Sequence, residues 1–240
     1  MSRYSLFSNV YSTVVPPKFL FHKKDSSKVA HREVIIKKPN NSFIIEAFNL
    51  NDSVCLVTGA FDTGICAFLK NGEIVNEFIE PYTKTGDFTS RALKDANLFM
   101  LSNSKEHLLR ITQNGGFIGL YKVDLANMDI ITLFKKEYFP VEVKVKNNSL
   151  TFTKQSKYGY ISACVTDKYI YGLYCGKEIK NQNFKGNQIH VYTYDGNLKY
   201  NLNLDIPISG ITVDNKDEKI FGIKAEGENE LCFYLLPDNL

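Results

Sequence analysis

A strand–turn–strand unit recurs along this chain and constrains its fold more than any other feature of the sequence. Each copy has two short runs of alternating apolar residues with a glycine-containing turn between them. The turns lie at Asn71-Gly72, Asn114–Gly116 and Asp195-Gly196. A fourth candidate, Leu231–Leu236, ends at Pro237–Asn239 and has no strand after it. Asn-Gly and Asp-Gly turns favour β-hairpins because their central residues can adopt positive φ. The sequence therefore predicts an all-β protein built from antiparallel hairpins.

The spacing of these turns indicates how the hairpins are assembled. Positions 71, 114, 195 and 238 are separated by 43, 81 and 43 residues, and 81 is close to two repeats. A period in the low forties is typical of a β-propeller with four-stranded antiparallel blades. The double gap predicts a further blade within residues 125–157, with strands at Ile130–Phe134, Val141–Val145 and Leu150–Thr153. No Pro-, Gly- or Ser-rich linker divides the chain, so we expect residues 1–240 to form a single domain.

Composition and charge exclude several classes of protein. Hydrophobic residues make up 44% of the chain and aromatic residues 13%, which excludes a disordered protein. The net charge of +3 is too small to indicate nucleic-acid binding. No run of about 18 apolar residues occurs, so no membrane span is predicted. The five cysteines form no Cys-x-x-Cys pair and read as buried thiols, although a single disulfide remains open.

The two ends of the chain carry opposite charge. Residues 18–38 contain seven basic side chains and two acidic ones, whereas residues 205–240 contain eight acidic side chains and three lysines. If the ends are neighbours, the two charges neutralise each other. The alternative is that the basic stretch binds a partner. We also expect a strand within residues 4–37 to pair with Leu231–Leu236, because an open strand edge invites aggregation.

Motifs that resemble catalytic ones fail on spacing. Asp62-Thr63-Gly64 matches the aspartic-protease triplet, but that chemistry needs a second copy, and the sequence predicts a turn instead. Gly172 and Gly176, followed by Lys177, are one residue too close for a phosphate-binding loop. No two of the four histidines have the spacing of a metal-ligand pair. We therefore assign no catalytic residue, and whether the protein is an enzyme stays open, with the balance against it.

Acidic residues near predicted strand ends are the candidate ligand-binding residues. They are Asp167, Asp195, Asp205 and Asp214. Propellers build ligand and Ca²⁺ sites from such residues at the mouth of the central channel. The alternative is that the four aspartates only form turns. Convergence of several carboxylates within about 5 Å of one point would favour a metal site, because Ca²⁺ is held by several oxygen atoms.

Two stretches resemble a known family, namely Gly159–Lys177 and Ile189–Asp214. The first contains a Tyr-Ile-Tyr-Gly-Leu-Tyr strand followed by Gly176-Lys177, and the second contains the Asp195-Gly196 hairpin. Together they resemble the TolB-like six-bladed β-propeller family of Bacteroides-type bacteria, over residues 158–236 above all. The resemblance implies six blades, one or more of them incomplete, and a place in the cell envelope or periplasm, because members usually carry a lipoprotein signal. It implies no catalytic activity.

These observations lead to three hypotheses about function. The first is a non-catalytic binding or sensing module that needs no cofactor and contacts a protein or small molecule with one face of its ring. The second is a hydrolase or lyase that uses a metal ion, Ca²⁺ above all, at the channel mouth. The third is a structural protein with an exposed apolar face. The N-terminus shows no signal segment, so the protein is cytoplasmic if Met1 is its true start.

Overall fold

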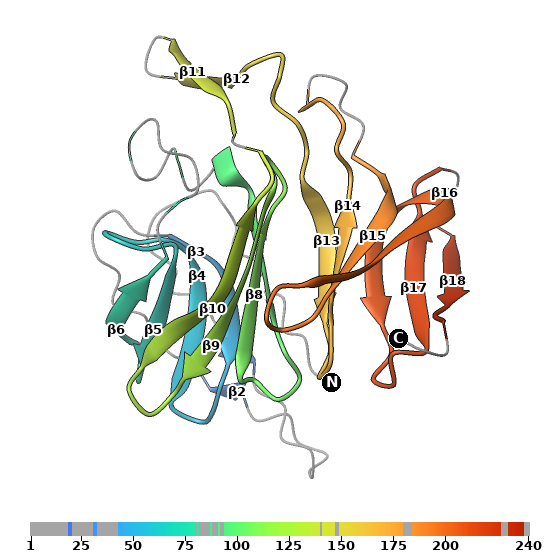
Figure 1. The fold of residues 1–240 in the computed structure, drawn as a ribbon. Coiled ribbons are helices and arrows are strands. Elements are labelled where there is room, and N and C mark those ends of the chain that lie inside the picture. Colours follow the sequence, from blue (N-terminus) through green and yellow to red (C-terminus); the bar gives the residue numbers. More distant parts are fainter. Residues whose placement is uncertain are drawn as a thin grey trace. The chain divides into compact units, whose positions relative to one another are not determined.

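The computed structural model describes most of the chain and is almost entirely antiparallel β-structure (Figure 1). The described residues are 19–20, 31–32, 43–79, 81, 87, 91, 94–139, 141–146, 149–179, 184–226 and 230–237. The chain divides into two compact units, Met1–Glu80 with Leu125–Asp129, and Pro81–Asp124 with Ile130–Leu240. The expectation of a single domain stays a prediction. Among the described residues, no helix has the length and apolarity that a bilayer crossing requires.

The first unit contains a four-stranded antiparallel sheet whose strands follow one another in sequence order. These strands are β3 (Phe43–Asn49), β4 (Val54–Ala60), β5 (Cys66–Lys70) and β6 (Glu73–Phe78). Two further short strands, β1 (Phe19–Leu20) and β2 (His31–Arg32), pair with each other. The turn between β5 and β6 is Asn71-Gly72, with φ of 52° and 87°. This left-handed backbone is what the Asn-Gly hairpin signal predicts.

The second unit begins with another four-stranded antiparallel sheet, in the order β10-β9-β8-β7. Its strands are β7 (Asn97–Leu101), β8 (His107–Thr112), β9 (Phe117–Asp124) and β10 (Asp129–Glu137). A two-stranded hairpin of β11 (Val143–Lys146) and β12 (Ser149–Phe152) follows. The further blade predicted within residues 125–157 is therefore wrong. Ile130–Phe134 belongs to β10, the fourth strand of the preceding sheet.

The reason for this error lies in the turns that the spacing compared. Asn71-Gly72 and Asp195-Gly196 join the third strand of a sheet to its fourth, whereas Asn114–Gly116 joins the second strand to the third. The spacing from one turn to the next therefore mixed two kinds of turn. The extra length before the Asp195 turn is taken up by the β11–β12 hairpin rather than by a blade.

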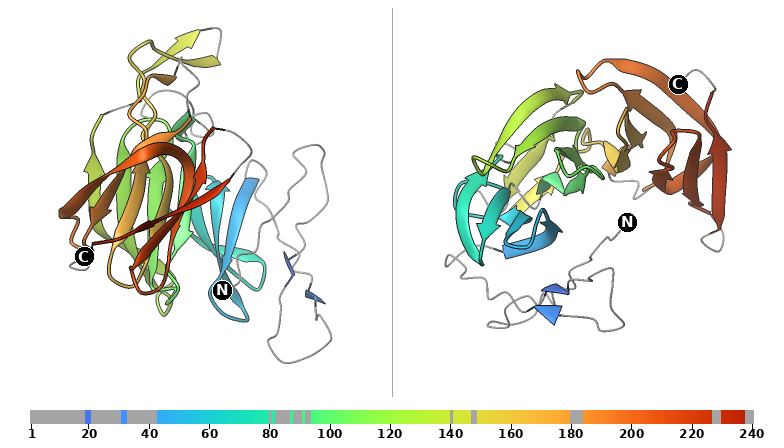
Figure 2. Two further views of the ribbon diagram at one scale, coloured as in Figure 1. Left: turned by 90° about the vertical axis from the view of Figure 1, so that its right-hand side faces the viewer. Right: turned by 90° about the horizontal axis from the view of Figure 1, so that it is seen from below.

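The remaining strands form a six-stranded antiparallel sheet in sequence order. They are β13 (Tyr160–Val165), β14 (Ile170–Tyr174), β15 (Gly186–Tyr192), β16 (Leu198–Val213), β17 (Lys219–Lys224) and β18 (Leu231–Leu235). The first half of β16 pairs with β15 and the second half pairs with β17, so one strand serves two blades. Figure 2 shows β16 as one continuous ribbon. The change of partner occurs around Pro207, which has no backbone N–H to give to a ladder.

The apolar core of the second unit lies on both faces of β14. Ile170 packs in a cluster with Leu109 and Ile118 of the preceding sheet, whereas Leu173 packs in a cluster with Ile208 and Ile220 of the following strands. Four of the five residues of β14 are buried. The prediction that Ile170 and Leu173 lie on opposite, buried faces of an inner strand is confirmed, as side-chain alternation along a strand requires.

The last strand, β18, is bonded on one side only within the part of the chain that the structure describes. It pairs with β17, and Leu231 is 80% exposed. The predicted pairing of Leu231–Leu236 with a strand from residues 4–37 falls mostly outside the described residues.

Candidate functional site

The four predicted aspartates are spread over the second unit. Asp167 and Asp195 are exposed residues in the turns β13–β14 and β15–β16, and Asp214 follows β16 directly. Asp205 lies inside β16 rather than in a turn, because the strand continues without interruption to Val213. Its placement at a strand end is therefore wrong.

The partners of these aspartates are mostly within their own turns. Asp195 accepts hydrogen bonds from Thr193 and Asn197, and the bond from the Thr193 hydroxyl lowers the pKa of its carboxyl. Asp214 accepts the backbone N–H groups of Glu218 at 2.8 Å and Lys219 at 3.1 Å, which closes the turn before β17. Among the described residues, no three His, Cys, Asp or Glu side chains gather as metal ligands would. A ligand-binding role for the four aspartates stays a prediction.

Asp217 carries a buried carboxylate that the sequence analysis did not single out. Asp217 is 7% exposed and has φ of 57°. Its Oδ1 atom accepts hydrogen bonds from Thr166 Oγ1 at 2.7 Å and from the Tyr171 hydroxyl at 2.8 Å. Burial and this bond to Asp217 raise the pKa of Tyr171. We call Thr166, Tyr171 and Asp217 the Asp217 junction; it ties the turns β13–β14 and β16–β17 together.

Asp62-Thr63-Gly64 lies in the turn between β4 and β5, as predicted. Thr63 donates its backbone N–H and its hydroxyl to Glu77 of β6, at 2.6 Å and 2.9 Å. The position of the triplet in a turn is sufficient to explain Asp62 and Gly64, because Asp and Gly are common turn residues.

A second polar group lies on the other face of β14 and extends from Tyr192, which pairs with Ile170, toward the start of β13 at Tyr160. Four side chains are joined there by hydrogen bonds, and we call them the Tyr–His network: Tyr138, Tyr160, His190 and Tyr192. The Tyr160 hydroxyl lies 2.8 Å from His190 Nδ1 and 2.7 Å from the Tyr192 hydroxyl. The Tyr192 hydroxyl is also bonded to the Tyr138 hydroxyl. The imidazole stacks on Tyr174, with ring centres 4.9 Å apart and an interplanar angle of 22°.

The strand register explains how these rings come together. His190 of β15 pairs with Gly172 of β14, which has no side chain to fill the space beside it. A Cβ atom at Gly172 would come within 2.7 Å of the Tyr160 ring, so only glycine leaves room for that ring. Tyr174 lies two residues after Gly172 and therefore on the same face of β14.

Burial sets the protonation of the network. It lowers the pKa of His190, so the imidazole is neutral at pH 7. Burial also raises the pKa values of Tyr160 and Tyr192, so both hydroxyls keep their protons. A neutral imidazole has one nitrogen that donates and one that accepts. The network is thus a chain of neutral hydrogen-bonding groups inside an apolar setting.

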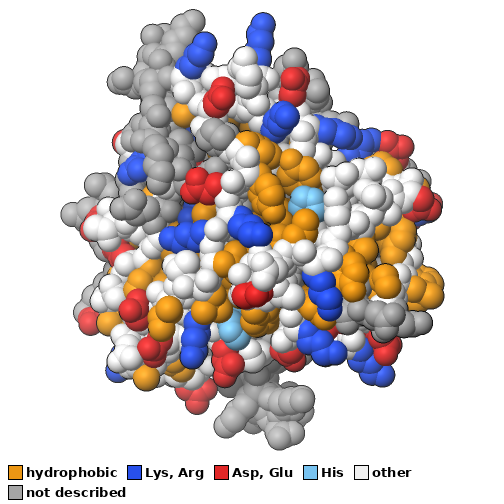
Figure 3. All heavy atoms as spheres, in the orientation of Figure 1, with side chains coloured by type: hydrophobic (Ala, Val, Ile, Leu, Met, Phe, Trp, Pro, Cys, Tyr) orange, Lys and Arg blue, Asp and Glu red, His pale blue; other side chains and the backbone are white. Residues whose placement is uncertain are grey.

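One end of the network reaches the surface. Tyr160 and Tyr192 are fully buried and His190 is 9% exposed, whereas Tyr138 is 45% exposed. Figure 3 shows hydrophobic side chains gathered on the surface over the upper part of β13 and β14. The residues of the network lie apart in the sequence, and nothing in the sequence indicated that they meet.

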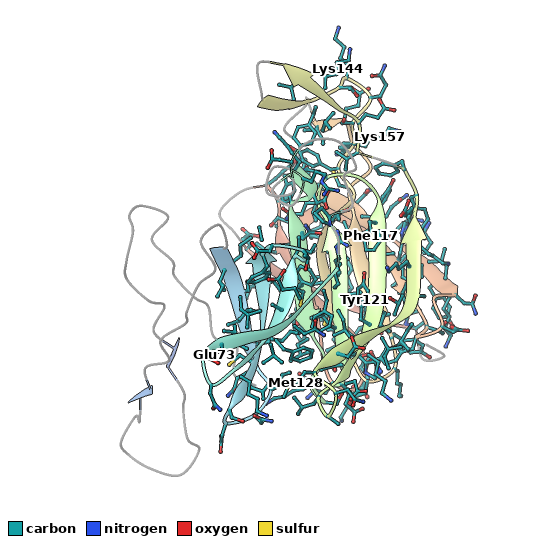
Figure 4. The ribbon with its side chains drawn as sticks, turned by 90° about the vertical axis from the view of Figure 1, so that its left-hand side faces the viewer. Glu73, Phe117, Tyr121, Met128, Lys144 and Lys157 are labelled. Carbon is teal, nitrogen blue, oxygen red and sulfur yellow. The ribbon has the colours of Figure 1, made fainter. Side chains whose placement is uncertain are left out.

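Basic side chains lie beyond this end of the sheets. Tyr138 is anchored beside the β8–β9 turn, where its backbone N–H donates to Gly116 at 2.7 Å. Figure 4 shows Lys157 and Lys144 beyond the Phe117 end of β9, on the side away from Tyr121. Both lysines are exposed. The surface around the network therefore combines aromatic rings with positive charge.

Comparison with solved structures shows the same fold. The β-propeller domain of Cps50 (Swd1) from Myceliophteria thermophila matches with a TM-score of 0.58 and 10% identity, over 93% of this chain and 64% of that one. A Bacteroides uniformis protein named as a 6-phosphogluconolactonase matches with a TM-score of 0.53 and 11% identity, over 92% of this chain and 61% of that one. The present chain thus spans less than two thirds of the length of either, and identities this low show the fold alone.

Comparison with curated proteins finds no match. The family model described as TolB-like 6-blade propeller-like matches residues 8–216, which is most of the chain. The antiparallel four-stranded sheets and the two structural neighbours agree with that match. The protein has a β-propeller fold, and the chain belongs to the TolB-like six-blade propeller family.

Proposed function

We propose that the protein is a non-catalytic binding module whose contact surface is built on the Tyr–His network and Tyr174. The observation that supports this most is a buried chain of hydroxyls and an imidazole that ends at the half-exposed Tyr138. Buried polar groups lose hydration, and an apolar core would avoid that cost. When a ligand forms hydrogen bonds with the ends of a polar chain that opens at the surface, those bonds can offset the free energy lost on desolvation.

The residue types at this surface suit recognition. Tyrosine offers a large, rigid, amphipathic contact surface with little loss of side-chain entropy. Tyr174 is fixed by stacking on His190, and Tyr138 is fixed by its bond to Tyr192. A pre-ordered surface loses less entropy on binding than a flexible one. The proposal requires no cofactor, and the ligand is a small molecule or the side chains of a partner protein.

The binding proposal is tested by histidine side-chain ¹H–¹⁵N NMR during titration with three probes: phenol, benzamide and methyl glucoside. The expected result is a saturable shift of the His190 signals with at least one probe, and none of the His107 signals. The substitution Tyr174→Ala, which removes the ring stacked on His190, should weaken that binding. If none of the probes shifts the His190 signals, the proposal is wrong.

The metal-dependent enzyme remains the second candidate, and Ca²⁺ titration separates it from the first. A hydrolase or lyase of that kind needs Ca²⁺ held by several carboxylates. Calorimetric binding of Ca²⁺ that is lost on Asp167→Asn or Asp214→Asn would favour the enzyme. The resemblance to the protein named as a lactonase does not add to this candidate, because it extends to the fold only.

We further propose that the protein acts in the cell envelope, on the basis of its family. Fractionation of the source cells, with an antibody against this chain, tests this. Recovery with the cytoplasmic fraction would contradict it.

A further inference from the structure

The hydrogen bonds of the Tyr–His network restrict where its protons can lie. Its three short bonds join Tyr138, Tyr192, Tyr160 and His190 Nδ1 in that order, and the Tyr192 hydroxyl also lies 3.4 Å from Nδ1. Each hydroxyl has one proton to donate, and a neutral imidazole has one N–H. Since each bond takes one proton, the donors along this chain are ordered together rather than one by one.

Four orderings fill all three bonds, because a hydroxyl oxygen can accept two hydrogen bonds. In the inward ordering, Tyr138 donates to Tyr192, Tyr192 to Tyr160, and Tyr160 to Nδ1; the imidazole proton is then on Nε2, and the Tyr138 oxygen accepts. In the outward ordering, Nδ1–H donates to Tyr160, Tyr160 to Tyr192, and Tyr192 to Tyr138; the Tyr138 proton is then free, and Nε2 accepts. In the two mixed orderings, Tyr138 donates to Tyr192 and Nδ1–H donates to Tyr160, so Nε2 and the Tyr138 oxygen both accept.

The two ends are open to a ligand and close enough for one small group to reach both. Among the described residues, His190 Nε2 has no hydrogen-bond partner. The ring centres of Tyr138 and His190 are 6.2 Å apart. None of the four orderings offers two donors at once. A carboxylate or phosphate, whose oxygens only accept, can satisfy His190 but then meets the lone pairs of the Tyr138 oxygen.

We propose that this surface selects neutral ligands that carry a hydrogen-bond donor and an acceptor side by side, such as amides, over carboxylates and phosphates. The proposal rests on the proposed function and names its ligand class. It runs against the attraction that lysines exert on anions: Lys144 and Lys157 are exposed, and Lys136 Nζ lies 5.4 Å from the centre of the Tyr192 ring. Solvent and salt screen the charges of exposed lysines, whereas the donors and acceptors of the network touch the ligand.

Benzamide and benzoate test the proposal, because they share a ring and differ in the group that the network meets. At pH 7.5 we expect benzamide to bind about tenfold more tightly than benzoate, as one well-placed hydrogen bond allows. Tyr138→Phe removes the outer end of the network and should reduce the preference to near one. Tyr158→Phe, a nearby tyrosine outside the network, is the matched control and should keep the preference.

The outcomes separate this proposal from the one it rests on. If benzoate binds as tightly as benzamide, or if Tyr138→Phe keeps the preference, the ligand class is wrong while binding at the network stands. If neither compound shifts the His190 signals, the ligand class is wrong, and the binding proposal is wrong as well if phenol and methyl glucoside also leave these signals unshifted. The ¹⁵N shifts of His190 provide a second measurement: bound benzoate should hold the proton on Nε2, and a bound benzoate with the proton on Nδ1 contradicts the ordering of protons described above.

Discussion

The Asp217 junction and the Tyr–His network bury polar side chains on opposite faces of β14, and they do so differently. The Asp217 junction, at the β13–β14 turn, is the closed end: its buried carboxylate accepts hydrogen bonds from two hydroxyl groups that come from adjacent elements of the same sheet. The Tyr–His network has an open end at Tyr138: its members come from three segments, and one of them is half exposed. A closed group serves the fold, whereas an open one has bonding capacity left for a ligand.

The largest effect is expected at the closed end. Asp217→Ala leaves the hydroxyls of Thr166 and Tyr171 without their acceptor, and alanine is strained at φ of 57°. We expect a loss of about 3 kcal/mol in the free energy of unfolding, measured by urea titration. Asp217→Asn is the control; it keeps an acceptor oxygen and tolerates this φ, and it should lose clearly less. Equal stability of Asp217→Ala and the parent would show that the junction is not structural.

A pair of Tyr→Phe substitutions compares the two ends directly. Tyr171→Phe removes one of the two hydroxyl donors to a buried carboxylate and should lose about 2 kcal/mol of unfolding free energy. Tyr138→Phe, at the exposed end of the network, should lose less than about 0.5 kcal/mol. Both values come from the same urea titration. The contrast between a closed and an open end fails if Tyr138→Phe is the more damaging of the two.

Within the Tyr–His network, removal of the Tyr160 hydroxyl should lower stability more than removal of any other hydroxyl. Tyr160→Phe keeps the buried ring but removes the hydroxyl that bonds to both His190 and Tyr192. We expect about 1 kcal/mol lower stability and a changed tautomer ratio of His190 in its ¹⁵N spectrum. Tyr169→Phe, an edge residue of the neighbouring turn, should leave that ratio as it is. An unchanged ratio in Tyr160→Phe would mean that Tyr160 does not set the proton position.

The pH dependence of stability should also come mainly from the open end. Burial lowers the pKa of His190 in the folded protein, while an unfolded histidine has a pKa of about 6.5. Between these two pKa values the unfolded chain binds more protons, so the free energy of unfolding falls as the pH is lowered from about 6.5 and levels off below the folded pKa. Burial lowers the pKa of His107 as well, partly offset by Glu106.

Urea titrations between about pH 4.5 and 8 cover the range in which histidine changes its charge. They separate the contributions of the two histidines to stability. His190→Gln should flatten the fall in stability more than His107→Gln does. The reverse order would place the pH-sensitive group at the turn end instead.

The smallest effect is expected for an exposed turn residue. Asp195 is exposed, and its hydrogen bonds go to neighbours within the same turn. Asp195→Ala should therefore leave the unfolding free energy close to that of the parent protein. A larger loss, measured by the same titration, would mean that Asp195 has a structural role like that of Asp217.

The same contrast explains what the sequence could predict. Local signals worked where the chemistry is local: Asn71-Gly72 predicts its own left-handed turn, and the apolar pattern around Ile170 predicts a strand buried on both faces. The signal failed for Asn114–Gly116, because a turn does not state which two strands of a sheet it joins. Asp217 could not be told from Asp214 either, since both lie in one polar turn and only tertiary packing buries one of them.

The Tyr–His network was even harder to predict from the sequence, because no pair of its members is a recognisable motif. It depends on the register that places His190 beside Gly172 and on the path that returns Tyr138 to the same end of the sheets. Tyrosine and histidine alternate in β15 with no sign of their function, and a strand histidine has many possible surroundings. The site is formed by the pairing of strands and segments that lie apart in the sequence, and local sequence patterns do not indicate which of them pair.

Strand β16 has a consequence for how the molecule responds to damage. Consecutive blades joined by a loop can be separated by a protease that cuts the loop. From Leu198 to Val213 the backbone is one extended strand, hydrogen-bonded first to β15 and then to β17. A protease finds no loop to cut between the half of β16 that pairs with β15 and the half that pairs with β17, because both halves belong to one strand. The last two strands are therefore joined to the rest of the sheet through a single rigid strand rather than through a flexible loop.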